Sequence, residues 1–493
     1  MRIKLIAPAR KPEWPESFWD LKTLCKLTGR KAGGSPLALP TLAALTPSDV
    51  KVILTDENVE PVNFEEKVDL VGITGMTCVI PRSYEIADEF RKRGVPVVMG
   101  GIHVSMLSDE AIQHSDSVVI GEAEEIWEQV IRDAQNKNLQ KFYRAPRFPD
   151  LTNSPIPRWG LLKNDLYPIF PVQTGRGCPY DCDFCSVQAF NGRRYRHRRI
   201  EDIIEEIKYF QDIERKKPIF FVDDNLLAVP SYAKQLFQLL TDLKVRWWCQ
   251  ASVNELDDNE TLELMYEAGC REVFIGFESV SQESLLSMHK STVNRAEKYK
   301  ELIEKIHSYG MAVFASFILG SDSDNKDTFG LTEKFIEKNN ILFSMVNILT
   351  PAPGTELYQR LHKENRLLSF DWWRFNGEHV CFKPLLMSDK ELCDGRIKLL
   401  ISVFSYKKIY QRLKNLWKYN LYVKRDKRKG IFRKSKFYIV WKGLVYGNIF
   451  HMDKIMFLFK FLFKLKSISI FSVVMALNFH DYIYRGYKKI YGE

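Results

Sequence analysis

Along the first 140 residues, the spacing of apolar and polar positions alternates between a pattern typical of strands and a pattern typical of helices. Short β-branched runs occupy residues 51–55, 70–74 and 95–99, and helical patterns such as 84–93 separate them. Runs of this kind are typical of strands, and strands that alternate with helices are typical of a parallel sheet. Residues 1–140 therefore predict an α/β domain with a doubly wound parallel sheet, which binds a ligand at the carboxyl ends of its strands.

The same alternation returns in residues 166–385. The preceding stretch, 141–165, is expected to be a linker because prolines at positions 146, 149, 155 and 157 break both helix and strand. After it, each strand pattern precedes an amphipathic helical pattern. The strand patterns are 170–173, 219–222, 247–251, 273–277, 312–319 and 343–349. These consecutive β/α units predict a partial, open β/α barrel.

The alternation ends near residue 385, and residues 386–493 are aromatic, basic and predicted to be helical. Residues 401–493 contain 21 Lys and Arg against 4 Asp and Glu, although the formal net charge of the whole chain is only +10. Such a basic segment usually meets an anionic surface, either lipid headgroups or nucleic-acid phosphates, unless it is simply a solvated helical face.

The apolar segment 455–466 favours lipid over nucleic acid as the partner. It carries lysines at positions 460 and 464, four residues apart, which suits a helix lying in a membrane interface. We therefore expect peripheral membrane association. The alternative is a helical cap over the barrel mouth, with the aromatic residues as its core. The best candidate for a membrane span, 467–480, is shorter than the roughly 18 apolar residues that a spanning helix needs.

Composition places the chain among folded proteins of a reducing compartment. Its 493 residues suit two or three domains, and a hydrophobic fraction of 45% with 27% charged residues excludes wholesale disorder. The N-terminus has no apolar run of the signal-peptide kind, so a cytoplasmic protein is expected, on the inner face of the membrane if the tail binds lipid. Nine cysteines, three of them within eight residues, indicate a metal site rather than a disulfide framework.

Those three cysteines form the strongest chemical signal in the chain. Cys178, Cys182 and Cys185 have the spacing C-x3-C-x2-C and directly follow a predicted strand. Three thiolates on a short loop can bind three corners of a [4Fe-4S] cluster and leave the fourth iron open. A zinc site is the alternative, and it would need a fourth ligand, for which His197 is the nearest candidate.

The cysteine loop resembles the signature of the radical S-adenosylmethionine (SAM) superfamily, whose fold is a partial β/α barrel. The resemblance implies that the amino and carboxylate groups of SAM chelate the open iron. It also implies that an electron from the reduced cluster cleaves SAM to a 5′-deoxyadenosyl radical, with flavodoxin or ferredoxin as the electron donor. Phe184, next to the last cysteine, would then lie beside the adenine.

Further SAM contacts are expected at the ends of three later strands. Asp223, Asp224 and Asn225 could hold the ammonium group of SAM, or could instead cap a helix. Gln250, Ser252 and Asn254 alternate along the next strand, so all three could face inward. Glu278 follows Gly276 in a segment that resembles the ribose site of the family, and its carboxylate could accept hydrogen bonds from the ribose hydroxyls. The loop 351–355 resembles a family loop beside the adenine.

A doubly wound domain before such a barrel resembles the cobalamin-binding radical SAM enzymes. The loops 71–77, 99–103 and 119–124 resemble cobalamin-domain loops. The resemblance implies cobalamin contacts at Thr74, Thr77, Gly100, Gly101, Gly121 and Glu122. Residues 56–61 lack the histidine that binds cobalt in some cobalamin domains, and His103 is either a cobalt neighbour or an ordinary loop residue. The alternative is that this domain is a scaffold without cofactor.

Segments 248–253, 273–279 and 316–324, with the helical tail, resemble the hopanoid C-2 methylase group. The resemblance implies that one SAM methylates cobalt, that a second SAM yields the radical that abstracts hydrogen, and that the resulting carbon radical takes the methyl group. A small-molecule substrate of apolar, lipid-like character is expected. The alternatives are a radical SAM cyclisation, crosslinking or oxidation, and a basic RNA-binding module with a structural metal.

Overall fold

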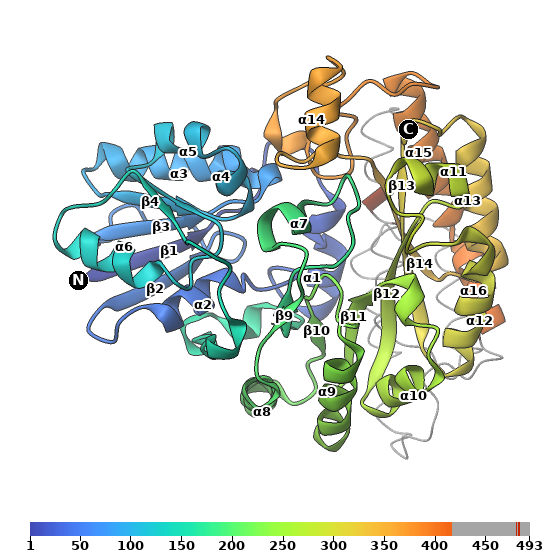
Figure 1. Ribbon diagram of the computed structural model, residues 1–493, viewed down its shortest axis with the longest axis horizontal. Coiled ribbons are helices and arrows are strands. Elements are labelled where there is room, and N and C mark those ends of the chain that lie inside the picture. Colours follow the sequence, from blue (N-terminus) through green and yellow to red (C-terminus); the bar gives the residue numbers. More distant parts are fainter. Residues whose placement is uncertain (417–479, 481, 484–493) are drawn as a thin grey trace.

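The computed structural model describes residues 1–416 together with residues 480, 482 and 483. Two parallel sheets stand side by side, and the short helix α7 (Ser186–Asn191) lies between them (Figure 1). The first sheet has the strand order β2-β1-β3-β4-β5-β6 and is parallel throughout. Its strands are β1 (Arg2–Ala7), β2 (Lys51–Asp56), β3 (Leu70–Thr74), β4 (Val97–Gly100), β5 (Ser117–Ile120) and β6 (Phe142–Arg144).

Helices cover both faces of this sheet because successive side chains of each strand point to opposite faces. Leu5 packs in one core with Trp127 of α6, whereas its neighbour Ile6 packs in another core with Phe90 of α3. The doubly wound fold is therefore confirmed. The helices of this domain are α1 (Lys22–Thr28), α2 (Ala38–Leu45), α3 (Ile80–Lys92), α4 (Ile102–Met106), α5 (Ser108–His114) and α6 (Trp127–Gln135).

The edge strand β6 lies inside the segment 141–165 that we expected to be a linker. Its residues pair with β5 in parallel, Val119 opposite Tyr143, and the Tyr143 ring is buried. The prolines begin only after this strand, so the first sheet ends inside the segment that we expected to be a linker.

The second sheet is the predicted partial barrel. It is parallel throughout, in the order β14-β13-β12-β11-β10-β7, and is not closed into a ring. Its strands are β7 (Phe170–Val172), β10 (Ile219–Phe221), β11 (Trp247–Ala251), β12 (Cys270–Glu278), β13 (Ala312–Leu319) and β14 (Phe343–Ile348). Its helices are α8 (Ile200–Glu214), α9 (Pro230–Leu243), α10 (Asn259–Glu267), α11 (Gln282–Ser287), α12 (Tyr299–Ser308), α13 (Asp327–Lys338) and α14 (Glu356–Lys363).

Two short strands form an antiparallel hairpin beside the barrel. They are β8 (Gly175–Arg176) and β9 (Arg196–His197), with Arg176 opposite Arg196. The residues between them, 177–195, contain the three cysteines of the motif and α7. The hairpin therefore closes the base of the segment that carries the candidate cluster ligands.

The chain after the barrel is helical, as predicted, in α15 (Asp389–Val403) and α16 (Tyr406–Leu416). Arg412 of α16 is almost fully buried, and its Nη1 lies 2.6 Å from Glu337 Oε1 of α13. Lys408 is paired with Glu333 of the same helix. These two tail cations are thus neutralised by the barrel. The segments 455–466 and 417–442, which carry the membrane prediction, lie outside the described residues. In the described part of the chain, no helix has the length and apolarity needed to cross a membrane.

Hydrogen bonds tie the N-terminal domain to the rest of the chain at several points. Tyr167 donates to Asp56 Oδ2 at 2.8 Å, and Trp372 Nε1 donates to Glu110 Oε1 at 3.0 Å. The backbone N–H of Phe18 donates to Glu378 Oε1 at 2.9 Å. The two domains are therefore docked by contacts that do not involve the cysteine motif.

The turn from α10 into β12 gives a direct test of the barrel. Gly269 has φ +103°, and a Cβ there would lie 2.0 Å from the carbonyl oxygen of Val245. We expect Gly269→Ala to destabilise the barrel by about 2 kcal/mol or more, through backbone strain and overpacking, and to lower its unfolding midpoint by several degrees. Thermal unfolding followed by circular dichroism measures this.

Gly330→Ala is the matched control. Gly330 lies in α13 with open space around its Cβ position, so alanine should stabilise that helix by about 0.5–1 kcal/mol. Equal unfolding midpoints for the two variants would contradict the described turn.

Candidate active site

The cysteine-bearing loop, residues 177–185 (hereafter the cluster loop), runs from β8 to α7. Cys182 is buried, and Cys178 and Cys185 are partly buried. The backbone N–H of Cys178 donates to Gly192 O at 3.3 Å, and that of Cys185 donates to Cys182 O at 3.1 Å. His197, which the zinc alternative required, stacks on the ring of Tyr232 with centroids 4.1 Å apart. Among the described residues, no three His, Cys, Asp or Glu side chains are grouped so as to hold one metal ion.

One ammonium group faces all three thiols. Burial raises the pKa of Cys178 to about 11 and that of Cys185 to about 12, while the positive charge of Lys290 opposes the shift in both. Burial would lower the pKa of Lys290, but Glu278 and the three cysteines raise it. A set of thiols around one cation suits an anionic thiolate cluster, because iron binding replaces the thiol protons. The donor chemistry therefore fits a [4Fe-4S] cluster.

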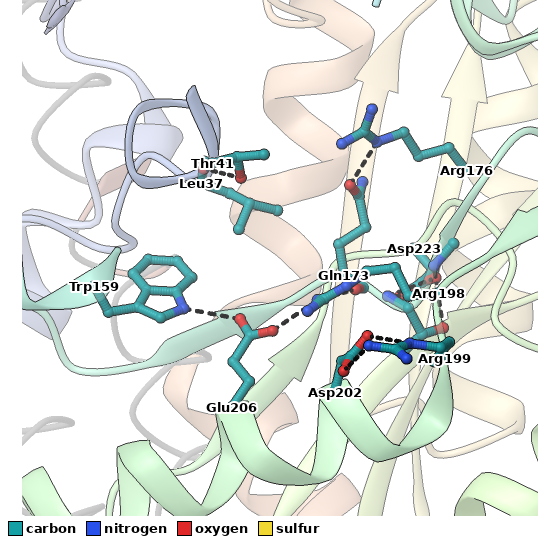
Figure 2. A network of polar contacts seen from close by, with 12 residues as sticks. Leu37, Thr41, Trp159, Gln173, Arg176, Arg198, Arg199, Asp202, Glu206 and Asp223 are labelled. Atoms are coloured by element: carbon teal, nitrogen blue, oxygen red, sulfur yellow. Dashed lines mark hydrogen bonds and ion pairs between the residues drawn. The ribbon is translucent and has the colours of Figure 1, made fainter. Parts of the chain in front are cut away.

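The backbone just before the cluster loop is held by Asp223, which is fully buried. Its carboxylate accepts hydrogen bonds from Thr174 N at 3.0 Å, Thr174 Oγ1 at 2.8 Å, Gly175 N at 2.5 Å and Tyr195 OH at 2.9 Å. Figure 2 shows Asp223 on the barrel wall close to Gln173 and Arg198. The alternative role of Asp223 as a helix cap is wrong, because α9 begins seven residues later at Pro230. Its contact with SAM stays a prediction, and in the structure its oxygens accept hydrogen bonds from the chain's own donors.

The middle of the cluster loop is held by the barrel's other edge. Asp183 donates its backbone N–H to Met288 O at 3.3 Å and accepts from the N–H of Leu357 in α14 at 2.9 Å. Its Oδ2 lies 3.6 Å from Arg360 Nη2. Phe184, the expected adenine neighbour, is partly buried and packs against the main hydrophobic core. The loop is thus attached to elements from both ends of the barrel sequence.

A hydrogen-bonded chain of side chains continues from the cluster loop. Tyr180 OH donates to Glu255 Oε1 at 2.9 Å, and Asn225 Nδ2 donates to the same oxygen at 2.8 Å. Asn254 Nδ2 donates to Tyr180 OH at 2.7 Å. Asn225 Oδ1 is buried and has no hydrogen-bond partner among the described residues. A buried acceptor of this kind suits a ligand that brings N–H or O–H donors, as the ammonium group of SAM does.

The expected inward alternation after β11 is only partly correct. Gln250 lies on the strand and its Nε2 donates to the carbonyl oxygen of Asp223 at 3.2 Å. The strand ends at Ala251, however, and Ser252 and Asn254 belong to the turn into a 3-10 helix, Val253–Glu255. The period-two argument fails there because a backbone hydrogen bond from Glu255 N to Ser252 O turns the chain.

Asp224 and Glu278 are the remaining predicted SAM contacts. The Asp224 side chain is solvent-exposed, yet partial enclosure by protein and the nearby charge of Asp223 raise its pKa to about 6. Glu278 is buried at the end of β12 with φ +61°, a left-handed conformation that costs a non-glycine residue about 1–2 kcal/mol. Its carboxylate folds back over Gly276, where a Cβ would lie 2.2 Å from Glu278 Oε1, and it lies 3.9 Å from Lys290 Nζ. Strain of this kind is typical of functional sites.

A cavity of about 370 Å³ opens at the carboxyl ends of β3, β4 and β5. Its floor is apolar and includes Leu5, Gly72 and Trp127, and the barrel closes it with Gln173 and Arg176, which lie side by side in Figure 2. The predicted cobalamin residues that line it are Thr74, Gly100, Gly101, Gly121 and Glu122.

The cavity fits part of a cobalamin. A Cβ at Gly101 would lie 2.9 Å from Thr74 Oγ1, so the cavity keeps its width at this point because residue 101 has no side chain. Cavities of roughly 300–1,000 Å³ hold drug-sized groups, and cobalamin is larger, so only one portion of it would enter. The described lining residues include no histidine. His103 instead packs edge-on against Trp372, with ring centroids 5.0 Å apart, and does not line the cavity.

Two predicted cobalamin residues have other contacts. Thr77 does not line the cavity, and its Oγ1 lies 3.3 Å from His103 Nδ1. The Glu122 carboxylate is bound by Arg176 and Arg196, which outweigh the effect of burial and lower its pKa. Both residues therefore serve protein contacts, although Glu122 still borders the cavity.

Comparison with known proteins agrees with this arrangement. Residues 172–336 match the radical SAM superfamily and residues 30–131 match the B12 binding domain, while residues 355–491 match a domain of unknown function, DUF4070. The bacteriochlorophyllide d C-8(2)-methyltransferase of Chlorobaculum tepidum is 33% identical over 398 residues, 76% of this chain and 87% of that protein. The chain belongs to the cobalamin-dependent radical SAM methyltransferase family.

A further relative supports the family assignment, and a solved structure supports the fold. The hopanoid C-2 methylase of Rhodopseudomonas palustris is 30% identical over 348 residues, 68% of this chain and 66% of that protein. The solved structure of the radical SAM methyltransferase TsrM from Kitasatospora setae, with cobalamin and a [4Fe-4S] cluster bound, covers 99% of both chains with a TM-score of 0.62 and 14% identity. The enzyme thus uses a [4Fe-4S] cluster, SAM and cobalamin, as the sequence predicted.

Several residues around the cluster loop were not anticipated from the sequence. They are Tyr180, Asp183, Glu255 and Lys290. Tyr180 and Asp183 lie between the cysteines and could have been flagged by position alone. Lys290 lies 105 residues after Cys185, in the turn after α11, and nothing in its local sequence marks it.

The role assigned to Asp223 is tested by Asp223→Asn. The amide replaces an acceptor oxygen with a donor that faces N–H and O–H donors. Each buried group left without a hydrogen-bond partner costs about 1–3 kcal/mol of folding free energy. We expect a severalfold lower iron content after anaerobic reconstitution, with cobalamin binding unchanged. Iron assay and optical spectra measure both.

The exposed neighbour provides the matched control, since Asp224→Asn should load iron normally. If Asp223→Asn instead loads a full cluster and only raises the KM for SAM, Asp223 contacts SAM and does not hold the loop.

Proposed function

We propose that the enzyme transfers a methyl group to an unactivated carbon of an apolar, lipid-like substrate. The observation that carries the proposal is the shared cavity. One wall consists of cobalamin-type loops, and the facing wall is formed by Gln173, Arg176, Phe190 and Asn191, which flank the cluster loop on both sides. A radical generated at the barrel and a methyl donor held by the N-terminal domain would therefore meet at this cavity.

The chain's own residues have definite tasks in this reaction. When bound, the cluster and SAM supply a 5′-deoxyadenosyl radical, and cobalamin supplies the methyl group. Cys178, Cys182 and Cys185 hold the iron, while Lys290 offers a cation to the carboxylate of SAM and Asn225 offers an unpaired acceptor to its ammonium group. We assign to Glu278 the acceptance of hydrogen bonds from the ribose hydroxyls. Gln250, Asp224 and Phe184 remain candidates for the rest of the SAM site.

The proposed substrate class draws on the relatives and on the cavity. The names of two relatives state that they methylate a hopanoid and a bacteriochlorophyllide, which are both large, polycyclic and mainly apolar. The floor of the cavity is likewise apolar. A small one-electron carrier such as flavodoxin or ferredoxin would reduce the cluster. The nine cysteines lie among the described residues and form no disulfide there, which suits a reducing cytoplasm.

Product analysis tests methyl transfer. The anaerobically reconstituted enzyme, given reductant, SAM and extracts of apolar metabolites, should form S-adenosylhomocysteine and 5′-deoxyadenosine in roughly equal amounts. Cys182→Ala should form no 5′-deoxyadenosine because the cluster loses a ligand, whereas Cys393→Ala, in α15, should behave as the unaltered enzyme.

The outcomes separate the competing chemistries. 5′-Deoxyadenosine without S-adenosylhomocysteine would identify a cyclisation, crosslinking or oxidation instead of methylation. Turnover by Cys182→Ala would overturn the assignment of the cluster ligands.

We further propose that the enzyme associates with the inner face of the membrane through the basic, apolar segment 455–466. Each lysine near an anionic surface contributes about 1 kcal/mol of binding free energy. The double variant Lys460→Gln with Lys464→Gln should therefore lose about 2 kcal/mol, which weakens binding to phosphatidylglycerol vesicles by about 30-fold. Vesicle co-sedimentation of the full-length enzyme measures this.

A cation already paired within the protein serves as the control. Lys408→Gln should leave vesicle binding unchanged, because Lys408 is paired with Glu333. Binding that is equally strong to neutral phosphatidylcholine vesicles, or no binding at all, would remove the membrane proposal.

A further inference from the structure

Glu122 connects the cavity loop of the N-terminal domain to the barrel. It follows Gly121 at the carboxyl end of β5, and it is only 5% exposed. Its Oε2 lies 2.8 Å from Arg176 Nη1 and accepts from Arg196 Nη1 at 3.0 Å. Its Oε1 accepts from Asn191 Nδ2 at 3.0 Å and also pairs with Arg196 Nη2. One buried carboxylate therefore receives hydrogen bonds from three barrel side chains.

Those three side chains flank the cluster loop on both sides. Arg176, in β8, lies two residues before Cys178, and Asn191, the last residue of α7, lies six residues after Cys185. Arg196, in β9, is opposite Arg176 in the hairpin that closes the base of the segment. Glu122 thus holds the entry and the exit of the cluster loop at one point, and that point belongs to the other domain.

The backbone next to Glu122 is itself fixed to the cavity wall. The N–H of Gly121 donates to Ser105 Oγ at 2.9 Å, and Ser105 Oγ donates to Gly101 O at 2.8 Å. Gly101 and Gly121 both line the cavity. A displacement of the cluster loop would therefore be passed through Glu122 to two loops of the cobalamin-type wall.

The charges at this point balance. Arg176 also lies 2.5 Å from Glu124 Oε1, so two carboxylates face two guanidinium groups in a largely buried cluster. Removing the charge of Glu122 leaves an excess positive charge between the domains, which is relieved when the loops move apart or admit water.

We propose that Glu122 is a positioning residue that sets the spacing between the cluster loop and the cobalamin-type wall, and so couples radical formation to methyl transfer. The proposal rests on the proposed function. It extends that function by naming the residue that keeps the site of radical formation and the site of methyl transfer at a fixed spacing. Without its charge, SAM cleavage continues, but fewer of the radicals lead to a transferred methyl group.

Glu122 is distinct from general domain docking. The bonds Tyr167–Asp56, Trp372–Glu110 and Phe18–Glu378 join the N-terminal domain to the rest of the chain without it. In a Glu122 variant these contacts keep the domains together, so only the local spacing at the cavity changes.

The test compares Glu122→Gln with Glu66→Gln in the full-length enzyme loaded with iron, sulfide and cobalamin. Glu66 is a matched control, because its carboxylate binds Arg2 at 2.8 Å and Lys4 at 2.9 Å entirely within the N-terminal domain. Two quantities are measured. The first is the ratio of S-adenosylhomocysteine to 5′-deoxyadenosine, and the second is the cob(II)alamin-to-reduced-cluster distance distribution from pulsed electron paramagnetic resonance.

For Glu122→Gln we expect full iron and cobalamin content, a product ratio at least fivefold lower, and a broader or longer distance distribution. Glu66→Gln should match the unaltered enzyme in both measurements. If Glu122→Gln folds poorly, Asn191→Ala removes one bond without a charge and should shift both quantities in the same direction by a smaller amount.

An unchanged ratio with an unchanged distance distribution would overturn the proposal, and so would an equal loss of both products. If the unaltered enzyme forms no S-adenosylhomocysteine, the proposed function fails. The distance measurement still decides whether Glu122 sets the spacing.

Discussion

The cluster loop must keep three thiols in one place although its neighbours belong to different parts of the chain. Buried carboxylates meet this constraint. Asp223 binds the backbone just before the loop, and Glu122 reaches across the domain boundary to residues on either side of it. A buried carboxylate is stable only when donors surround it, so each of these side chains fixes the positions of the groups it binds. The oxygens of both anchors are occupied by the groups that they bind.

The same constraint explains why the cavity lies between the two domains. The parallel sheet of the N-terminal domain presents small residues at the ends of its strands, and the barrel presents the hairpin β8–β9 and helix α7 (Figure 1). Residues that precede and follow the cluster loop therefore also line the cavity, among them Arg176 and Asn191. Gln173, which lies beside Arg176 in Figure 2, lines it too.

The fold could be predicted from the sequence because it is encoded locally, and the cysteines were proposed as metal ligands from an equally local signal. All six barrel strands were expected within a few residues, since apolar runs bounded by helical patterns determine them. The three cysteines are recognised by their spacing, C-x3-C-x2-C. The roles of Asp223, Glu122 and Lys290 could not be predicted, because each depends on which distant groups the fold brings to it. Ser252 was misplaced because the sequence does not mark where a strand ends in a turn.

The central claim is that three thiolates leave one iron of a [4Fe-4S] cluster open for SAM. Mössbauer spectroscopy of ⁵⁷Fe-reconstituted, anaerobic enzyme with and without SAM tests this most directly. The account predicts that on adding SAM one iron in four acquires a distinct isomer shift while the other three stay unchanged. Four irons that remain equivalent with SAM present, or protein that retains zinc in place of iron, would contradict it.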